Sequence, residues 1–199
     1  ANTAWAFACM DWKDRDVFVA LADACSRRMS AMGENHLSQL YLVLLHVRLE
    51  WPDLSFALSP HDRKLQFAYQ RKNLAPSQFQ RDVAAALDRV GWTHVFEHMT
   101  PEGLSLDMAK LAEKHAVEVD GPTHFAKVPA TKTYVENGST RFKSRLLRRL
   151  GWHIVRVPYF EWNRLLNAAE KDAYLRSRGL SAAAPRMAWQ TGPPPGLSS

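Results

Sequence analysis

The chain has 199 residues, of which 46% are hydrophobic, so it can bury a substantial core as one domain or as two small ones. No apolar run approaches the roughly 20 residues needed to cross a bilayer, so we expect no membrane-spanning segment. Its two cysteines, Cys9 and Cys25, lack the C-x-x-C spacing of a zinc site and are typical of small core residues in a reducing compartment.

The first half of the chain has the spacing of α-helices. Apolar residues recur at intervals of three and four in two runs, 17–25 and 37–45, and Gly33 separates the runs. The sequence opens without methionine inside a helical pattern, and we therefore expect it to be the C-terminal part of a longer protein.

A faint internal repeat runs through the same region. Residues 1–7 align with residues 37–43 at an offset of 36 residues, an interval typical of helical solenoids. An ordinary helical bundle is the alternative. Residues 52–76 contain three prolines, and we expect them to form a linker with one short helix.

The apolar period changes to two beyond residue 91, which predicts a small sheet. The expected elements are a helix at 77–90 capped by Ser77, strands at 92–97, 104–109 and 115–120, a loop over 121–139, a helix from a Thr140 cap to Leu150, a strand at 152–157 and a helix at about 160–178. The predicted class is α+β, with a helical region over 1–76, an α/β domain over 77–180 and a flexible tail over 181–199.

Three carboxylates and a histidine form the first candidate site. Alternation places Glu118 and Asp120 on one face of their strand, and Asp107 joins them if the neighbouring strand pairs with it. Converging carboxylates suit Mg²⁺, and His124 could act as a general base. The alternative is structural: one carboxylate caps the Gly121-Pro122 turn, another pairs with an arginine from the basic helix, and His124 fixes the loop.

A basic segment forms the second candidate site. Residues 141–164 carry seven arginine and lysine residues against a single glutamate, a net charge of +6 that equals the charge of the whole chain. A localised patch of this kind is typical of a nucleic-acid partner, although a charged helix face is often only solvated. The predicted RNA-binding residues are Arg141, Lys143, Arg145, Arg148, Arg149 and Arg156.

Aromatic residues flank this basic segment. Trp152 alternates with Ile154 and is predicted to lie in the core, whereas Tyr159 and Trp162 could lie in the core or stack on unpaired bases. Gly121 follows the last carboxylate at a strand exit, where we expect a backbone angle closed to other residues.

Several of these motifs together resemble the RAP domain, an RNA-binding module of organellar proteins. The matching segments are Leu106-Asp107, Glu118 to Phe125, Asn137 to Thr140, Lys143 with Leu146 and Leu147, Gly151-Trp152, and Val157 to Trp162. The resemblance implies a restriction-endonuclease-like fold, and the first half of the chain resembles the octotricopeptide-like helical repeats that precede such domains.

The resemblance also bears on catalysis. Related nucleases carry an acid on one strand and Glu-x-Lys on the next; Asp107 and Glu118 match the acids, but Asp120 stands where the lysine would be. Loss of that lysine removes a group that orients water and offsets developing charge. We therefore expect binding without hydrolysis.

Together with the basic segment, the resemblance implies an organellar RNA-binding protein that needs no cofactor. Its expected partner is ribosomal RNA or another organellar transcript, with ribosomal proteins as further partners if it belongs to a mitochondrial ribosome. The expected location is the mitochondrion, with the chloroplast as the alternative. The rival function is a metal-dependent endoribonuclease that uses Asp107, Glu118, Asp120 and His124 with Mg²⁺; a protein-interaction scaffold is a third possibility.

Overall fold

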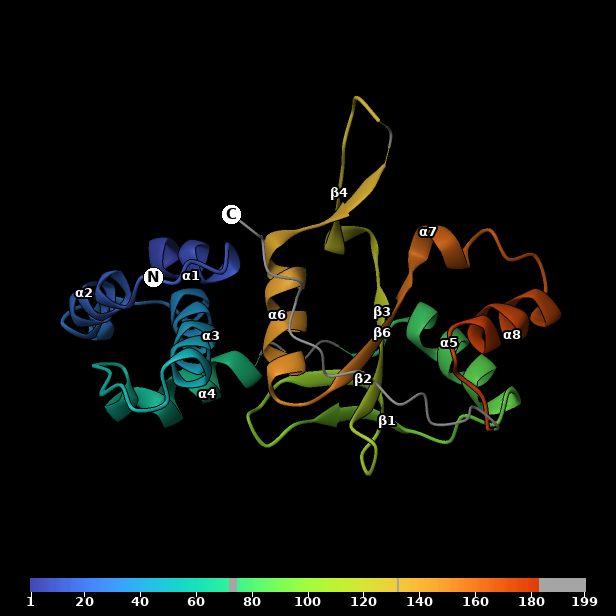
Figure 1. Cartoon of the computed structure of the whole chain (residues 1–199), viewed down its shortest axis with the longest axis horizontal. Helices are drawn as coiled ribbons and strands as arrows, with labels where there is room; N and C mark the ends of the chain where they lie inside the picture. The colour runs from blue at the N-terminus through green and yellow to red at the C-terminus, as the bar shows by residue number, and fades with distance from the viewer. Residues whose placement is uncertain (72–74, 132, 183–199) are drawn as a thin grey trace, which may run out of the picture.

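The computed structural model describes residues 1–71, 75–131 and 133–182. Helices fill the first part of the chain, and a mixed sheet flanked by helices follows (Figure 1). The N-terminal helices are α1 (Asn2–Cys9), α2 (Arg15–Ser26), α3 (Glu34–Glu50) and α4 (Asp62–Gln70), with short 3₁₀ turns at Met29–Ala31 and Ser59–His61.

Helix α3 is the centre of the N-terminal helices. Nine of its residues are buried, because α1 and α4 pack against it on different sides. The hydroxyl of Ser38 on α3 donates a 2.9 Å hydrogen bond to the carbonyl of Ala68 on α4. The short helix expected within 52–76 is therefore α4, and it is packed against α3 rather than free.

The sheet has four strands in the order β1-β2-β3-β6. Strands β1 (Val95–Met99), β2 (Ser105–Lys110) and β3 (His115–Asp120) form an antiparallel meander, and β6 (His153–Pro158) pairs in parallel with β3. Parallel neighbours need a crossover connection, and here it contains helix α6 (Gly138–Arg149). Five of the six β3 residues are buried because helices cover both faces of the sheet.

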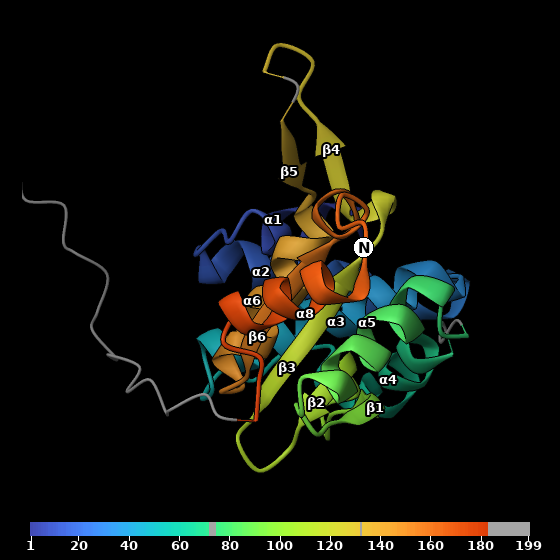
Figure 2. The ribbon, with the colours of Figure 1, turned by 90° about the vertical axis from the view of Figure 1, so that its right-hand side faces the viewer.

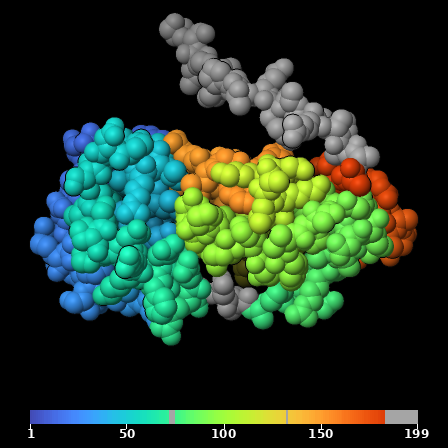
Figure 3. Space-filling view, turned by 90° about the horizontal axis from the view of Figure 1, so that it is seen from below, coloured from blue at the N-terminus to red at the C-terminus, as the bar shows by residue number. Residues whose placement is uncertain are grey.

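Helices lie on opposite faces of the sheet. Figure 2 shows α5 (Gln78–Arg89) and α8 (Ala168–Ser177) in front of β3, with the N-terminal helices behind it. One hydrophobic cluster joins the α6 side of the sheet to the N-terminal helices, and a second cluster lies beneath α5 and α8. The helical region and the sheet therefore share one core and abut directly (Figure 3).

The segment expected to be a loop over 121–139 contains regular structure. A 3₁₀ turn at Pro122–His124 leads into a hairpin of β4 (Phe125–Lys127) and β5 (Tyr134–Glu136), which projects from the body of the molecule (Figure 1). Helix α6 then begins after Asn137, whose side chain accepts a 2.9 Å hydrogen bond from the Thr140 N–H. Thr140 is thus inside the helix, and its assignment as the cap is wrong.

Two other boundaries differ from expectation. Strand β1 runs over Val95–Met99 instead of 92–97, because the Trp92 N–H bonds back to the Leu87 carbonyl of α5 and the ladder with β2 begins only at Val95. The last helix is two helices, α7 (Tyr159–Trp162) and α8, and the Asn167 side chain caps the second by accepting a hydrogen bond from the Glu170 N–H. The tail predicted over 181–199 lies almost wholly outside the described residues.

Two further expectations concern single features. Gly121 has φ −69° and ψ 176°, angles open to most residues, so its predicted special conformation is wrong. Within the described part of the chain, no helix is long and apolar enough to cross a membrane.

Candidate nucleic-acid interface

Strands β2 and β3 pair as the carboxylate hypothesis required. Met108 faces Val117 across the ladder, which brings the preceding Asp107 beside Glu118. Asp107 is held by two donors: its Oδ2 accepts a 2.7 Å hydrogen bond from the Val119 N–H, and its Oδ1 accepts a 2.8 Å bond from the Gln80 side chain on α5. Asp107 therefore links the interior strands β2 and β3 to α5.

Glu118 forms a buried ion pair with the basic helix. Lys143 Nζ lies 2.7 Å from Glu118 Oε2, and the Glu118 side chain is only 4% exposed. Burial raises the pKa of Glu118 in spite of the lysine beside it. Burial acts to lower the pKa of Lys143, but Glu118 and the neighbouring acidic groups outweigh it, and that pKa is raised. Lys143 is thus a structural counter-ion, which corrects its assignment to RNA phosphates.

Asp120 is fully buried and forms a second ion pair. The Arg156 guanidinium from β6 binds it through two nitrogens, with Nε 2.6 Å from Asp120 Oδ2. Arg156 also donates to Ser144 Oγ at 2.5 Å and lies 3.2 Å from Glu136. His124 Nδ1 approaches Asp120 Oδ1 at 3.0 Å and holds the turn after β3. Arg156 therefore serves this network, not an exposed phosphate site.

The carboxylates do not fit a magnesium ion. Mg²⁺ demands octahedral oxygen ligands, yet Asp107 and Asp120 already accept hydrogen bonds from protein donors on both oxygens. Among the described side chains, Glu118 Oε1 is the one oxygen of the three carboxylates without a hydrogen-bond partner. Lys143 does place an amine beside Glu118, but it comes from α6 and not from position 120. The residue type at position 120 therefore gives no sign of the lysine that lies beside Glu118.

Two arginines of the basic helix pack against the N-terminal helices. Arg145 Nε lies 3.1 Å from Asp11 Oδ1, and the same side chain donates to the Ala8 carbonyl. Arg149 Nη2 lies 2.8 Å from Glu50 Oε1. The expectation that Arg145 faces solvent is therefore wrong, and both arginines fasten α6 to the helical region.

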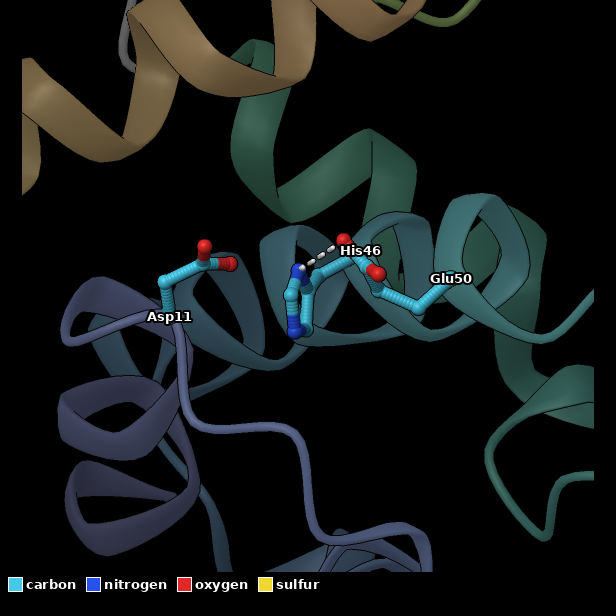
Figure 4. Close-up of side chains that lie close together, drawn as sticks. All are labelled: Asp11, His46 and Glu50. Carbon is cyan, nitrogen blue, oxygen red and sulfur yellow. Dashed lines mark ion pairs between the residues drawn. The ribbon is translucent and has the colours of Figure 1, made fainter. Parts of the chain in front are cut away.

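Those contacts surround a histidine–carboxylate group. Figure 4 shows Asp11, in the turn after α1, beside His46 and Glu50, which are one turn apart on α3. Burial lowers the pKa of His46 to about 4. Lys13 and Arg149 lie within 2.8 Å of Glu50 Oε1, so protein cations already neutralise the carboxylates. The group is therefore a poor metal site.

The remaining cations of α6 are exposed. Arg141 and Arg148 form no ion pair with any described residue, and they lie seven residues, or two turns, apart on one helix face. A rise of 1.5 Å per residue separates them by about 10 Å. Three more cations beyond β3 are exposed and have no described ion-pair partner: Lys127, Arg164 and Arg176.

Aromatic side chains gather where the hairpin meets α7. Tyr134 and Phe160 stack with ring centroids 4.4 Å apart and planes at 11°, and Phe125 meets Phe160 edge-on at 5.1 Å. Tyr159 lies 5.8 Å from Tyr134, and a hydrogen bond with Tyr134 raises the pKa of Tyr159.

Trp162, the other aromatic residue that could have stacked on bases, lies in the core. It is 2% exposed, and its Nε1 donates a 2.7 Å hydrogen bond to Asp82 on α5. Trp152 is also buried, as predicted.

The comparisons with known proteins identify the class of this region. Residues 117–178, which run from β3 to the end of α8, match the RAP domain. The chain is also 30% identical over 186 residues to a chloroplastic RAP domain-containing protein of rice, Oryza sativa subsp. japonica. That alignment covers 88% of this chain but only 28% of the rice protein. The chain therefore contains a RAP domain, and it spans little more than a quarter of the length of this relative.

Proposed function

We propose that this chain binds RNA through its RAP domain, and that the contact surface includes the exposed face of α6. The RAP domain supports a general RNA-related role. Arg141 and Arg148 carry the proposal further, because they are exposed, face the same side and lack an acidic partner among the described residues.

Charge pairing explains why this face would attract a polyanion. Within the RAP domain the acidic side chains of β3, β5 and α7 are engaged by Lys143, Arg156 and Arg178. Each of these ion pairs offsets the charge of its own partners. The exposed arginines are left uncompensated, and their potential extends into solvent, where phosphate groups release counterions on binding.

The test is a salt-dependent binding titration with labelled single-stranded RNA. Replacing Arg141 and Arg148 with glutamate should lower the affinity at least about tenfold and reduce the slope of log K against log salt by about 1.4, since two phosphate contacts are lost. The fold should persist, because neither side chain has a described ion-pair partner.

Arg176→Glu is the matched control. Arg176 is exposed on α8, which covers the opposite face of the sheet from α6, so this variant changes the net charge without touching the proposed surface. The control is compared with the single variants Arg141→Glu and Arg148→Glu, which change the net charge by the same amount. If all three lowered the RNA affinity equally, the loss would be a general charge effect and would contradict a site on α6.

We further propose that the carboxylate cluster does not hydrolyse RNA. The support is that protein donors occupy the oxygens of Asp107 and Asp120 and that Lys143 holds Glu118. The parent protein should leave RNA intact in Mg²⁺ or Mn²⁺. Cleavage that both Asp107→Ala and Asp120→Ala abolish would establish the endoribonuclease instead, whereas contaminating nuclease would persist in the variants.

The cellular setting that we propose is an organelle, with the chloroplast favoured by the name of the rice relative. The mitochondrion, which was the first expectation from the sequence, has no support from that comparison. Ribosomal RNA within an organellar ribosome is a narrower candidate target. Co-sedimentation of the protein with ribosomal subunits in organelle lysates would support it, and recovery only with messenger or precursor RNA would point to another transcript.

A further inference from the structure

Four aromatic side chains of the RAP domain lie outside both hydrophobic cores. Phe125, Tyr134, Tyr159 and Phe160 belong to neither hydrophobic cluster of the described residues, and all four are partly exposed. Large rings that do not serve the main core and remain open to solvent are typical of recognition surfaces. We refer to these four residues as the ring cluster.

The ring cluster has an ordered arrangement. Tyr134 and Phe160 are nearly parallel, while Phe125 and Tyr159 meet their neighbours at steep angles. The rings come from two elements that approach only in the folded chain, the β4–β5 hairpin and the start of α7. A parallel pair with flanking edges offers a flat apolar platform, and a nucleotide base can extend such a stack.

The segments that carry the rings, and the start of α6, also carry cations without an acidic partner among the described residues. Lys127 pairs with Tyr134 across the hairpin, Arg164 follows α7 by two residues, and Arg141 lies in the first turn of α6, just after β5. All three are exposed and have no ion-pair partner among the described residues. The nearby acid Glu136 is instead 3.2 Å from Arg156. The ring cluster therefore lies in a part of the described chain whose exposed cations are unpaired and whose acids Glu136 and Glu161 are paired.

We propose that the ring cluster stacks on unpaired RNA bases, so that the RAP domain selects single-stranded RNA over duplex. This inference rests on the proposed RNA-binding function and deepens it. Bases in a duplex are already stacked and cannot reach the rings, whereas unpaired bases can turn out onto aromatic side chains. The exposed cations of the neighbouring segments then hold the phosphates of the same strand.

The first arm of the test needs no change to the protein. Binding is measured for a labelled single strand, for the same strand annealed to its complement, and for the single strand with abasic nucleotides in place of bases. We expect the duplex and the abasic strand to bind about tenfold more weakly than the intact single strand. The phosphates are retained in all three, so this loss reports the bases.

The second arm uses Tyr159→Leu and Tyr134→Leu. Leucine keeps apolar volume but removes the flat ring, so each variant should bind the intact strand about tenfold more weakly and the abasic strand no more weakly than the parent does. Phe67→Leu is the matched control, because Phe67 is an exposed aromatic residue on α4, away from the hairpin (Figure 1). Thermal unfolding of each variant checks that the fold is retained.

The outcomes separate the two claims. If the parent protein binds no RNA, the proposed function itself fails. If the parent binds RNA but discriminates neither against abasic strands nor against duplex, RNA binding stands and base stacking is overturned. Equal losses for intact and abasic strands in the leucine variants would also overturn it, since the rings would then only support the hairpin or contact a protein.

Discussion

The ion pair between Glu118 and Lys143 gives the sharpest prediction about stability. Replacing Lys143 with methionine leaves a carboxylate that is 4% exposed without its counter-ion. Removal of one partner of a buried pair costs about 3 to 5 kcal/mol, and the lower end applies here because the Lys143 side chain is 24% exposed. We therefore expect Lys143→Met to lose about 3 kcal/mol near neutral pH, which lowers the melting temperature by roughly 6 to 12 °C.

The assay is denaturant unfolding followed by tryptophan fluorescence. The double variant Glu118→Gln with Lys143→Met should recover most of the loss, because no buried charge remains. In Lys143→Met the pKa of Glu118 should be raised further, so the folded protein binds a proton at a higher pH than the unfolded chain does. Stability then falls as pH rises through that interval, and the loss in this variant should be smaller near pH about 5 than near pH about 8.

A loss below about 1 kcal/mol at both pH values would refute the reasoning. Lys143 would then be a surface cation after all, and its original assignment to RNA phosphates would become the better one.

Substitutions at His46, Gly121 and Trp152 should change the stability of the fold by very different amounts. The pKa of His46 is about 4 in the folded chain, below its usual 6.5, so stability should fall by about 3 kcal/mol as pH drops from about 6.5 to about 4; His46→Phe should flatten this dependence in parallel titrations. Gly121→Ala should change the unfolding free energy by less than about 0.5 kcal/mol, since φ is −69° and open space surrounds the added methyl; a larger loss in urea melts would contradict it. Trp152→Ala should cost about 3 to 5 kcal/mol, and a loss under 1 kcal/mol would show that the ring is not a core anchor.

Local sequence signals predicted the elements that depend on local chemistry. Strand β3 has the expected bounds, His115–Asp120, because alternation and the following Gly121-Pro122 define it without help from distant residues. Helix α5 begins after Ser77, where the side chains of Ser77 and Gln80 form a reciprocal capping box. A capping signal also marks the start of α8, because Asn167 is followed three residues later by Glu170. That signal could have predicted two helices where we expected one from the sequence.

The hairpin was missed because its stability is not local. Strands β4 and β5 are three residues each, and their rings pack against Tyr159 and Phe160, more than twenty residues further along the chain. Short strands with a long connection carry almost no periodic signal.

The sequence offered ion pairing of the carboxylates as an alternative to a metal site, but it could not say which cation pairs with which acid. Charge counting treats Lys143, Arg145 and Arg148 alike, yet Lys143 lies over buried Glu118, Arg145 reaches Asp11, and Arg148 is exposed. Which side chain of a basic helix faces acid and which faces solvent depends on how α6 packs between the sheet and α1. That packing is tertiary and cannot be read from the helix alone.

Photo-cross-linking of the intact chain to single-stranded RNA, followed by mass spectrometry of the linked peptides, tests the central claim most directly. We expect cross-links at Tyr134 and Tyr159 and in the peptides around Arg141, because the rings and the exposed face of α6 would contact RNA together. Cross-links confined to the N-terminal helices or to α8, or none above a non-binding control protein, would contradict an RNA site on the RAP domain.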